Sequence, residues 1–225
     1  MKKIAIAIDG PSGAGKSTIA RAASAKYKIV YVDTGAMYRT IGLAAQYAGV
    51  GSKDKEGIIA LLPSVHIEMS YDDEGVQRML LDGKDVSTEI RTPLSSIYAS
   101  DVSAIPEVRI FLMDMQRNMA KRHSVIMDGR DIGTVVLPDA EVKIFLTASP
   151  EARAQRRFLE LELKGMPTPY DEVLRDIQYR DAQDSSRATA PLKPAEDSVI
   201  LDTTELNFEE SLDAACKIIE AVMLA

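Results

Sequence analysis

The sequence predicts an α/β fold in which short parallel strands and helices form a three-layer, doubly wound sandwich. Five short apolar runs lack the strict polar alternation of half-exposed strands, as is typical of strands buried on both faces of a parallel sheet. Stretches rich in helix-forming residues separate these runs, an order that favours parallel pairing through helical crossovers. A chain of 225 residues with 46% hydrophobic content can fill the core of such a fold.

The five expected strands are separated by very different lengths of chain. The first run, at 2–9, leads into a glycine-rich loop and then into helix formers up to Tyr27. In open α/β sheets, ligands bind where parallel strands end, so the polar loops after these runs are candidate sites. The four later runs lie at 28–35, 124–133, 142–149 and 198–205.

Two stretches between the expected strands differ from the sheet pattern. From 63 to 91, short alternating runs flank turn signals such as DDEG at 72–75, which predicts an antiparallel hairpin. From 151 to 187, two charged helices flank a loop with Gly and Pro, which predicts a projecting helical flap. We therefore expect one unit over 1–225, with a core at 1–35, 110–150 and 188–225, an insertion at 36–109 and the flap at 151–187.

The run GPSGAGKST matches the P-loop spacing of Gly, four residues, Gly, Lys and Ser or Thr. It follows a strand and opens a helix, where backbone N–H groups and a helix N-terminus can bind a phosphate. In such loops Lys16 neutralises β- and γ-phosphate charge, Ser17 offers a hydroxyl to Mg²⁺, and Thr18 contacts the α-phosphate or caps the helix. The residues expected to bind a nucleoside triphosphate are Gly10, Pro11, Ser12, Gly13, Ala14, Gly15, Lys16, Ser17 and Thr18.

Composition narrows the partners of the chain. A net charge of −7 provides no broad positive field, so we expect neither nucleic-acid nor anionic-membrane binding. The single cysteine, Cys216, excludes an internal disulfide and fits a reducing compartment, with the cytoplasm as the default. The Asn-Lys-x-Asp guanine motif of GTPases is absent, and the chain shows no internal repeat. Among P-loop proteins, a small-molecule kinase fits these observations.

The flap carries arginines at helical spacing, which a kinase needs in order to neutralise two anionic substrates. On the second flap helix, Arg180 and Asp184 are four residues apart on one face. Together with Asp176 they also form a charge ladder that any solvated helix can carry, so the spacing leaves both interpretations open. The candidate cations of the flap are Arg153, Arg156, Arg157, Arg180 and Arg187.

Taken together, the segments GPSGAGKST, DTGAMYR, EIRT, PEVR, DGRDIGTVVLPDA, KIFLTAS, RAQRR and RDAQDSSRATAPL resemble the bacterial-type cytidylate kinases, from residue 3 to about 205. The resemblance implies a P-loop core with a five-stranded parallel sheet, a monophosphate-binding insertion, an Arg-rich lid, and phosphoryl transfer from ATP to CMP or dCMP. It places Thr34, Ser100, Arg109, Asp131 and Asp184 at the cytosine and sugar, Arg39, Arg130, Arg180 and Arg187 at the acceptor phosphate or the phosphoryl group, and Arg153, Arg156 and Arg157 over ATP.

The expected reaction is in-line phosphoryl transfer without a general base, because a phosphate monoester is already mostly dianionic at pH 7. Lys16, Arg130, Arg180 and the lid arginines would stabilise the charge, with Mg²⁺ on the phosphates. Asp128 either holds Mg²⁺-bound water or fixes its loop. An acceptor such as UMP or an alcohol, or an ATP-binding module without chemistry, remains an alternative; an alcohol would need Asp33, Asp128 or Asp131 as base. We expect a monomer.

Overall fold

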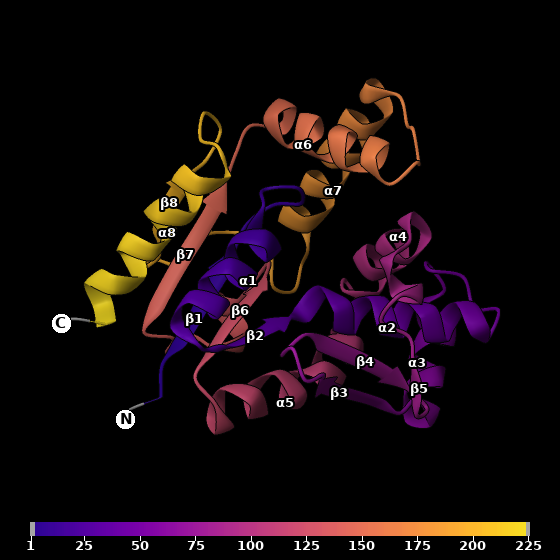
Figure 1. The fold of residues 1–225 in the computed structure, drawn as a ribbon. Coiled ribbons are helices and arrows are strands. Elements are labelled where there is room, and N and C mark those ends of the chain that lie inside the picture. Colours follow the sequence, from indigo (N-terminus) through magenta and orange to yellow (C-terminus); the bar gives the residue numbers. More distant parts are fainter. Residues whose placement is uncertain (1–2, 224–225) are drawn as a thin grey trace. The chain divides into compact units, whose positions relative to one another are not determined.

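The computed structural model describes residues 3–223, which form two compact units. The first unit comprises Met1–Ile29 and His123–Ala225, and the second comprises Val30–Arg122. The predicted boundaries of core, insertion and lid stay a prediction. The first unit holds the strands β1 (Ala5–Asp9), β6 (Val125–Gly129), β7 (Val142–Thr147) and β8 (Val199–Asp202) and the helices α1 (Lys16–Tyr27), α6 (Pro150–Leu163), α7 (Tyr170–Ser186) and α8 (Phe208–Met223) (Figure 1).

The larger sheet has the strand order β2-β6-β1-β7-β8, where β2 spans Val30–Asp33. β1 pairs in parallel with β6 and β7, and β7 pairs in parallel with β8. Ile6, Ile8 and Ile126 are fully shielded from solvent, as expected for strands covered on both faces. The predicted five-stranded parallel sheet is therefore confirmed, with β1 at its centre.

The helices of the first unit start where the local sequence favours a helix start. α1 follows directly on Gly15, whose φ of 90° lies in the left-handed region, and α1 packs against α8 (Figure 1). α6 begins after Ser149, whose side chain accepts a hydrogen bond from the Ala152 N–H, and Pro150 occupies the first helical position. α6 and α7 pack together as a helical hairpin, which confirms the two helices expected between 151 and 187.

The second unit contains a small antiparallel sheet of order β3-β4-β5. The turn between β3 and β4 is the predicted DDEG turn, in which the Gly75 N–H donates to the Asp72 carbonyl. The third strand, β5, is a two-residue addition that the sequence did not predict. The elements are α2 (Thr34–Tyr47), α3 (Lys55–Leu61), β3 (Ile67–Tyr71), β4 (Gln77–Leu81), β5 (Lys84–Asp85), α4 (Pro93–Val102) and α5 (Pro106–Arg122).

The chain after β6 departs from the expected strand run at 124–133. The strand ends at Gly129, and Ile132–Val136 form a single π-helical turn. The Asp9 carboxylate accepts hydrogen bonds from the first two N–H groups of this turn, at Ile132 and Gly133. Because Asp9 lies more than 120 residues earlier, local pattern gives no sign of the turn.

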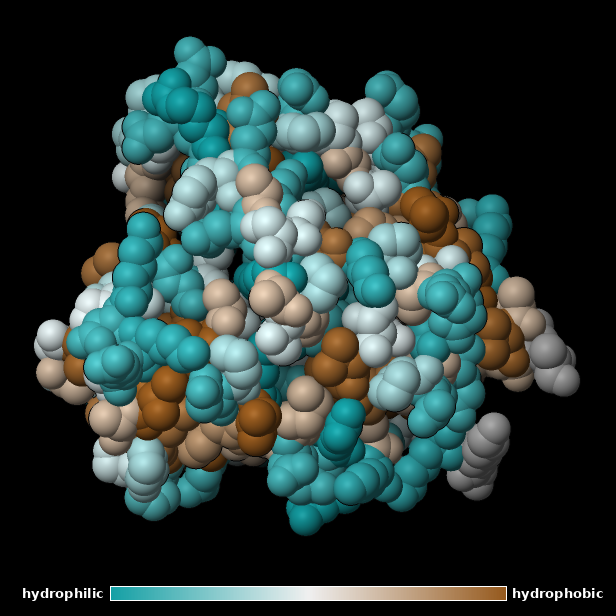
Figure 2. Space-filling view, turned by 180° about the vertical axis from the view of Figure 1, so that it is seen from behind, coloured by the Kyte–Doolittle hydropathy of each residue, from teal (hydrophilic) through white to brown (hydrophobic). Residues whose placement is uncertain are grey.

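Polar side chains dominate the surface seen in Figure 2, with apolar side chains in small groups among them. Of the helices between residues 3 and 223, none is both long and apolar enough to span a membrane.

The N-cap of α6 gives a first prediction. Ser149→Ala should lower the free energy of unfolding by about 1 kcal/mol, because the Ala152 N–H loses its side-chain acceptor. Urea denaturation followed by circular dichroism measures the change. Ser186→Ala at the end of α7 serves as the control, since its hydroxyl makes one long exposed bond to the Gln183 carbonyl. Equal losses in the two variants would contradict the assignment.

Candidate active site

The P-loop lies between β1 and α1, at the carboxyl end of the central strand. Gly10 has a φ of 147°, and a Cβ added there would lie 1.9 Å from the Leu146 carbonyl oxygen, so a side chain has no room. Lys16 is buried, and its Nζ donates to the Pro11 carbonyl at 2.7 Å. The lysine is thus held against the main chain of its own loop, between a strand and a helix N-terminus, an arrangement that suits a phosphate group.

The side chain of Lys16 carries its charge in a buried position, which affects its pKa. Burial, followed by the positive charge of Arg130, holds the pKa of Lys16 well below its usual value, while Asp128 and Asp184 act in the opposite direction. An anion beside the ammonium group favours its charged form. The negative charge of a nucleotide phosphate would therefore compensate the cost of burying this lysine.

Ser17 and Asp128 form the candidate metal position. The Ser17 hydroxyl donates to the Asp128 carboxylate at 2.8 Å, and Asp128 is buried within β6. Mg²⁺ is usually bound by one or two carboxylates together with substrate phosphates and waters. Among residues 3–223 no group of three or more His, Cys, Asp or Glu gathers in a way that could hold a metal. One hydroxyl beside one carboxylate fits an Mg²⁺ ion that takes its other ligands from a nucleotide and from water.

Asp184 joins two of the predicted phosphate-binding arginines. Arg130 Nε donates to Asp184 at 2.6 Å, and Arg187 donates to the other carboxylate oxygen. Although burial acts to raise it, Arg130 and Arg187 hold the pKa of Asp184 below its usual range. Asp184 is thus engaged by these arginines. Arg180 pairs with Asp176 at 3.7 Å, and both interpretations of the charges along α7 stay open. The cluster fixes two guanidinium groups in place.

Arg180 and Arg153 both contact Ser12 of the P-loop. Arg180 Nη1 donates to the Ser12 hydroxyl at 3.1 Å, and Arg153 Nη1 donates to the Ser12 carbonyl at 2.9 Å. Arg153 is buried, donates from Nε to the Ala148 carbonyl at 2.8 Å, and pairs with Asp181 at 2.6 Å. Two arginines from the α6–α7 hairpin therefore bind the same P-loop residue, Ser12.

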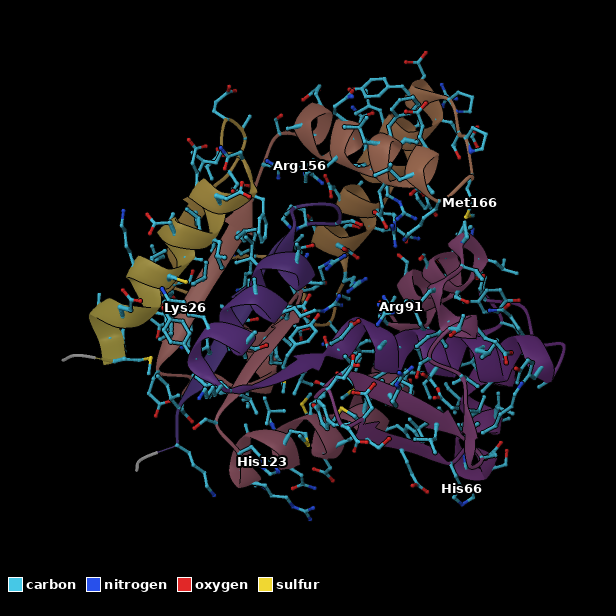
Figure 3. The ribbon with its side chains drawn as sticks, viewed as in Figure 1. Lys26, His66, Arg91, His123, Arg156 and Met166 are labelled. Carbon is cyan, nitrogen blue, oxygen red and sulfur yellow. The ribbon has the colours of Figure 1, made fainter. Side chains whose placement is uncertain are left out.

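The other two arginines of α6 have separate partners. Arg156, which is labelled in Figure 3, donates to the hydroxyl and carbonyl oxygens of Thr203, a residue that directly follows β8. Arg157 is one-third exposed and pairs with Glu160 at 2.8 Å. The structure thus ties Arg156 to main chain and leaves Arg157 near the surface, and their contact with ATP stays a prediction.

In the second unit, Asp33 gathers two arginines at the end of β2. Arg39 and Arg91 each lie 2.9 Å from the same oxygen of this carboxylate, and Asp33 also caps α2 through the Ala36 N–H. Against the effect of burial, Arg39 and Arg91 hold the pKa of Asp33 below its usual range. Figure 3 labels Arg91, for which residue chemistry alone predicted no role; its signal was its place in the segment EIRT.

The remaining predicted residues divide between the two units. Thr34 is buried at the first position of α2, and Ser100 lies on α4. Arg109 of α5 is buried, donates to the Ser103 carbonyl at 3.2 Å, and lies over the ring of Tyr38. In the first unit, Asp131 is buried directly before the π-helical turn.

Sequence reasoning missed Asp9, the residue before the first glycine of the P-loop. Its side chain is 5% exposed, and its two oxygens accept from Ile132 at 2.8 Å and Gly133 at 2.7 Å. Burial raises the pKa of Asp9 to about 6, opposed by these two hydrogen bonds. A carboxylate at the end of an apolar strand was the available signal.

The P-loop, the parallel sheet and the fixed arginines define a P-loop nucleotide kinase. The family described as Cytidylate kinase matches residues 6–221, and the chain belongs to this family. Cytidylate kinase of Caldicellulosiruptor saccharolyticus is 50% identical over 99% of this chain and 98% of its own length, and that of Bacillus pumilus is 49% identical over 98% and 96%. The expected family and its activity, CMP phosphorylation by ATP, are therefore confirmed.

A solved structure shows the fold alone. The crystal structure of an uncharacterized protein from Eubacterium ventriosum superposes with a TM-score of 0.54 at 13% identity, covering 97% of this chain and 99% of that one. At this identity the likeness extends to the arrangement of helices and strands and not to the reaction.

The raised pKa of Asp9 gives a pH prediction. With a pKa of about 6 when folded and 3.8 otherwise, the folded chain binds the proton more tightly, so the contribution of Asp9 to stability falls as pH rises. The difference in unfolding free energy between wild type and Asp9→Asn should fall by about 2 kcal/mol from pH 4.5 to 7.5. Urea denaturation at several pH values measures it.

Asp197→Asn provides the matched control. Hydrogen bonding to Lys143 lowers the pKa of Asp197, so the contribution of Asp197 to stability changes only at lower pH. The difference in unfolding free energy between wild type and Asp197→Asn should therefore stay nearly constant from about pH 4.5 to 7.5. A flat difference for Asp9→Asn as well would contradict the raised pKa.

Proposed function

We propose that this chain transfers the γ-phosphoryl group of ATP to either CMP or dCMP, with Mg²⁺ as the required metal ion. The observation that carries the proposal lies in the first unit, where Arg180 and Arg153 donate to Ser12 of the P-loop at 3.1 Å and 2.9 Å. Fixed cations beside a phosphate loop suit a reaction whose transition state spreads negative charge over the transferring group. The acceptor is inferred from membership of the cytidylate kinase family.

The P-loop would hold the β- and γ-phosphates, and Ser17 and Asp128 would hold Mg²⁺ directly or through water. When bound, the ion supplies charge neutralisation on the phosphate oxygens. Arg130 and Arg180 would stabilise the group in transit, since arginine donates paired, charge-assisted hydrogen bonds to phosphate. The acceptor phosphate needs no base at pH 7, so positioning and charge carry the reaction.

An alcohol acceptor fits two of its three candidate bases, Asp33 and Asp128, less well. Such an acceptor needs a carboxylate free to take a proton. Asp33 is shared by two arginines that keep its pKa low, and Asp128 accepts the Ser17 hydroxyl. The low pKa of Asp33 makes it a weak base, and the carboxylate of Asp128 already accepts a hydrogen bond. Both observations favour a phosphate acceptor.

Substrate recognition follows from the chemistry of cytosine. Its amino group is a donor, which suits carboxylate and hydroxyl acceptors, while its ring nitrogen and carbonyl suit an arginine. Fixing of Asp184 by Arg130 and Arg187 supports this assignment, since a carboxylate held in place can select a donor. The proposed CMP-binding residues are Thr34, Arg39, Ser100 and Arg109 in the second unit, and Arg130, Asp131, Arg180, Asp184 and Arg187 in the first.

The lid arginines Arg153, Arg156 and Arg157 are proposed to act around ATP. The contact of Arg153 with Ser12 supports a role through the P-loop. We further propose a monomer that acts in the cytoplasm, since a single buried cysteine suits a reducing compartment.

The test of the proposed function is ADP formation with ATP and Mg²⁺, comparing CMP, dCMP, UMP, AMP and no acceptor at equal concentration. We expect strong stimulation by CMP and dCMP and weak stimulation by UMP and AMP. Replacing Mg²⁺ by EDTA should abolish turnover. ATP binding without stimulation by any acceptor would contradict the proposal and favour a binding module.

Arg91 gives a prediction for the second unit. Arg91→Met should raise the KM for CMP about tenfold, because a charge-assisted hydrogen bond to phosphate contributes on the order of 1.5 kcal/mol. We propose that Arg91 contacts the acceptor phosphate, because it shares the Asp33 carboxylate with Arg39. Steady-state kinetics with each substrate varied in turn measures the effect.

Arg78→Met is the control, since Arg78 forms a partly exposed pair with Asp72 on the small sheet and should leave both KM values unchanged. An equal rise in the KM for ATP and for CMP in Arg91→Met would argue against a specific role at the acceptor phosphate.

A further inference from the structure

Asp9 connects two loops of the first unit that the proposed function uses. It is the last residue of β1 and directly precedes Gly10 of the P-loop. Its two carboxylate oxygens each accept one backbone N–H from the start of the π-helical turn, at Ile132 and Gly133. A carboxylate that accepts two adjacent N–H groups fixes both the position and the direction of the segment that donates them.

The segment that Asp9 holds is the continuation of the loop that carries Arg130. β6 ends at Gly129, which lies opposite Asp9 in the sheet register, and the π-helical turn begins at Ile132. Arg130 and Asp131 therefore span a short connection with both ends tied to Asp9, one through the sheet and the other through the carboxylate. The main chain of Arg130 has little freedom to shift while these contacts hold.

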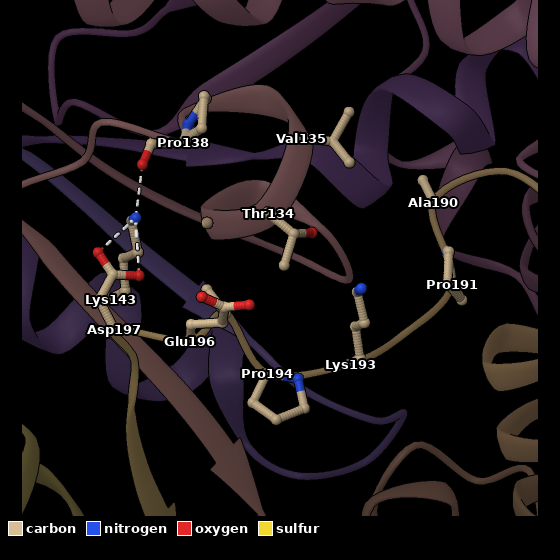
Figure 4. Close-up of a pocket in the computed structure, with 12 residues that line it drawn as sticks. Thr134, Val135, Pro138, Lys143, Ala190, Pro191, Lys193, Pro194, Glu196 and Asp197 are labelled. Carbon is tan, nitrogen blue, oxygen red and sulfur yellow. Dashed lines mark hydrogen bonds and ion pairs between the residues drawn. The ribbon is translucent and has the colours of Figure 1, made fainter.

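The chain that follows the same turn has contacts of its own. Lys143 of β7 donates to the Pro138 carbonyl and pairs with Asp197 at 2.7 Å, beside a pocket that the turn lines (Figure 4). A Cβ added at Gly133 would lie 3.2 Å from Lys143 Cδ and 3.4 Å from Asp9 Oδ2. Gly133 thus leaves little room for a side chain between Lys143 and Asp9.

We propose that Asp9 is a positioning residue for phosphoryl transfer, which places Arg130 by holding the N–H groups of Ile132 and Gly133. The assignment rests on the proposed role of Arg130. A role restricted to stability is the competing explanation, since a strand-end carboxylate can cap a turn without affecting the reaction.

The charge balance of the site supports a specific role for Asp9. Its neighbours include both Asp131, which disfavours the ionised form, and Lys16, which favours it. Burial raises the pKa of Asp9 to about 6, so keeping this carboxylate is costly to the fold. Costly buried ionisable groups are more common at functional sites than elsewhere.

A double-mutant cycle separates the two explanations. Asp9→Asn leaves one side-chain oxygen and places an NH₂ group where the second acceptor was. We expect kcat at saturating ATP and CMP to fall at least about tenfold, as for the loss of one charge-stabilising contact, with the KM for ATP changed less than about threefold. In the Arg130→Ala background, the same substitution should lower kcat by less than about twofold, because Arg130 is no longer there to be placed.

Two controls accompany the cycle. Asp197→Asn makes the same chemical change on the other side of the turn and should leave kcat unchanged. Ile219→Val, in the core of α8, lowers stability at a distance from the loop and should likewise leave kcat unchanged. If Asp9→Asn does not fold, the cycle is made with Gly133→Ala, whose Cβ would crowd Lys143 Cδ at 3.2 Å and Asp9 Oδ2 at 3.4 Å and which should show the same dependence on Arg130.

Each outcome of the cycle decides the proposal. If Asp9→Asn lowers kcat in the wild-type background but not in the Arg130→Ala background, the proposal is supported. Equal falls in both backgrounds, or a lower unfolding midpoint with unchanged kcat, overturn it. If Arg130→Ala alone leaves kcat unchanged, the proposed role of Arg130 is overturned. If that variant is still stimulated selectively by CMP, the proposed activity stands even though the role of Arg130 does not.

Discussion

The burial of charged groups at the carboxyl end of the parallel sheet is the constraint on which the rest of the site depends. Lys16, Asp9 and Asp128 are each at most 5% exposed. Asp9 and Asp128 lie at the ends of β1 and β6, and Lys16 begins α1 after the P-loop. A buried charge is tolerated only when other charges or hydrogen bonds compensate it. The loops after β1 and β6 supply those partners, and in doing so they take up fixed positions.

The same need for compensation accounts for the pairing of arginines with buried carboxylates. Arg130 and Arg187 share the carboxylate of Asp184, and in the second unit Arg39 shares Asp33 with Arg91. A guanidinium group bound to a carboxylate is oriented before any substrate arrives, which lowers the entropic cost of binding a phosphate. The pairs that lower the pKa of Asp33 and Asp184 thereby make these carboxylates poor bases, in keeping with a reaction that needs none.

The parts of the site that the sequence predicted are those whose chemistry is local. Gly10 to Ser17 could be recognised because strand, glycine loop and helix follow one another within a few residues, and the DDEG turn for the same reason. The π-helical turn and the role of Asp9 depend on contacts across more than 120 residues, and Arg91 meets Asp33 across 58 positions of chain. Spacing along α7 could not show that Arg130 binds Asp184, because Arg130 lies on a different element.

The measurement that tests the account most directly is the turnover of Arg130→Ala with saturating ATP and CMP, together with ATP binding by calorimetry. If fixed positive charge beside the P-loop carries the reaction, kcat falls at least about tenfold while the affinity for ATP changes little. Turnover equal to that of the wild type would contradict the account.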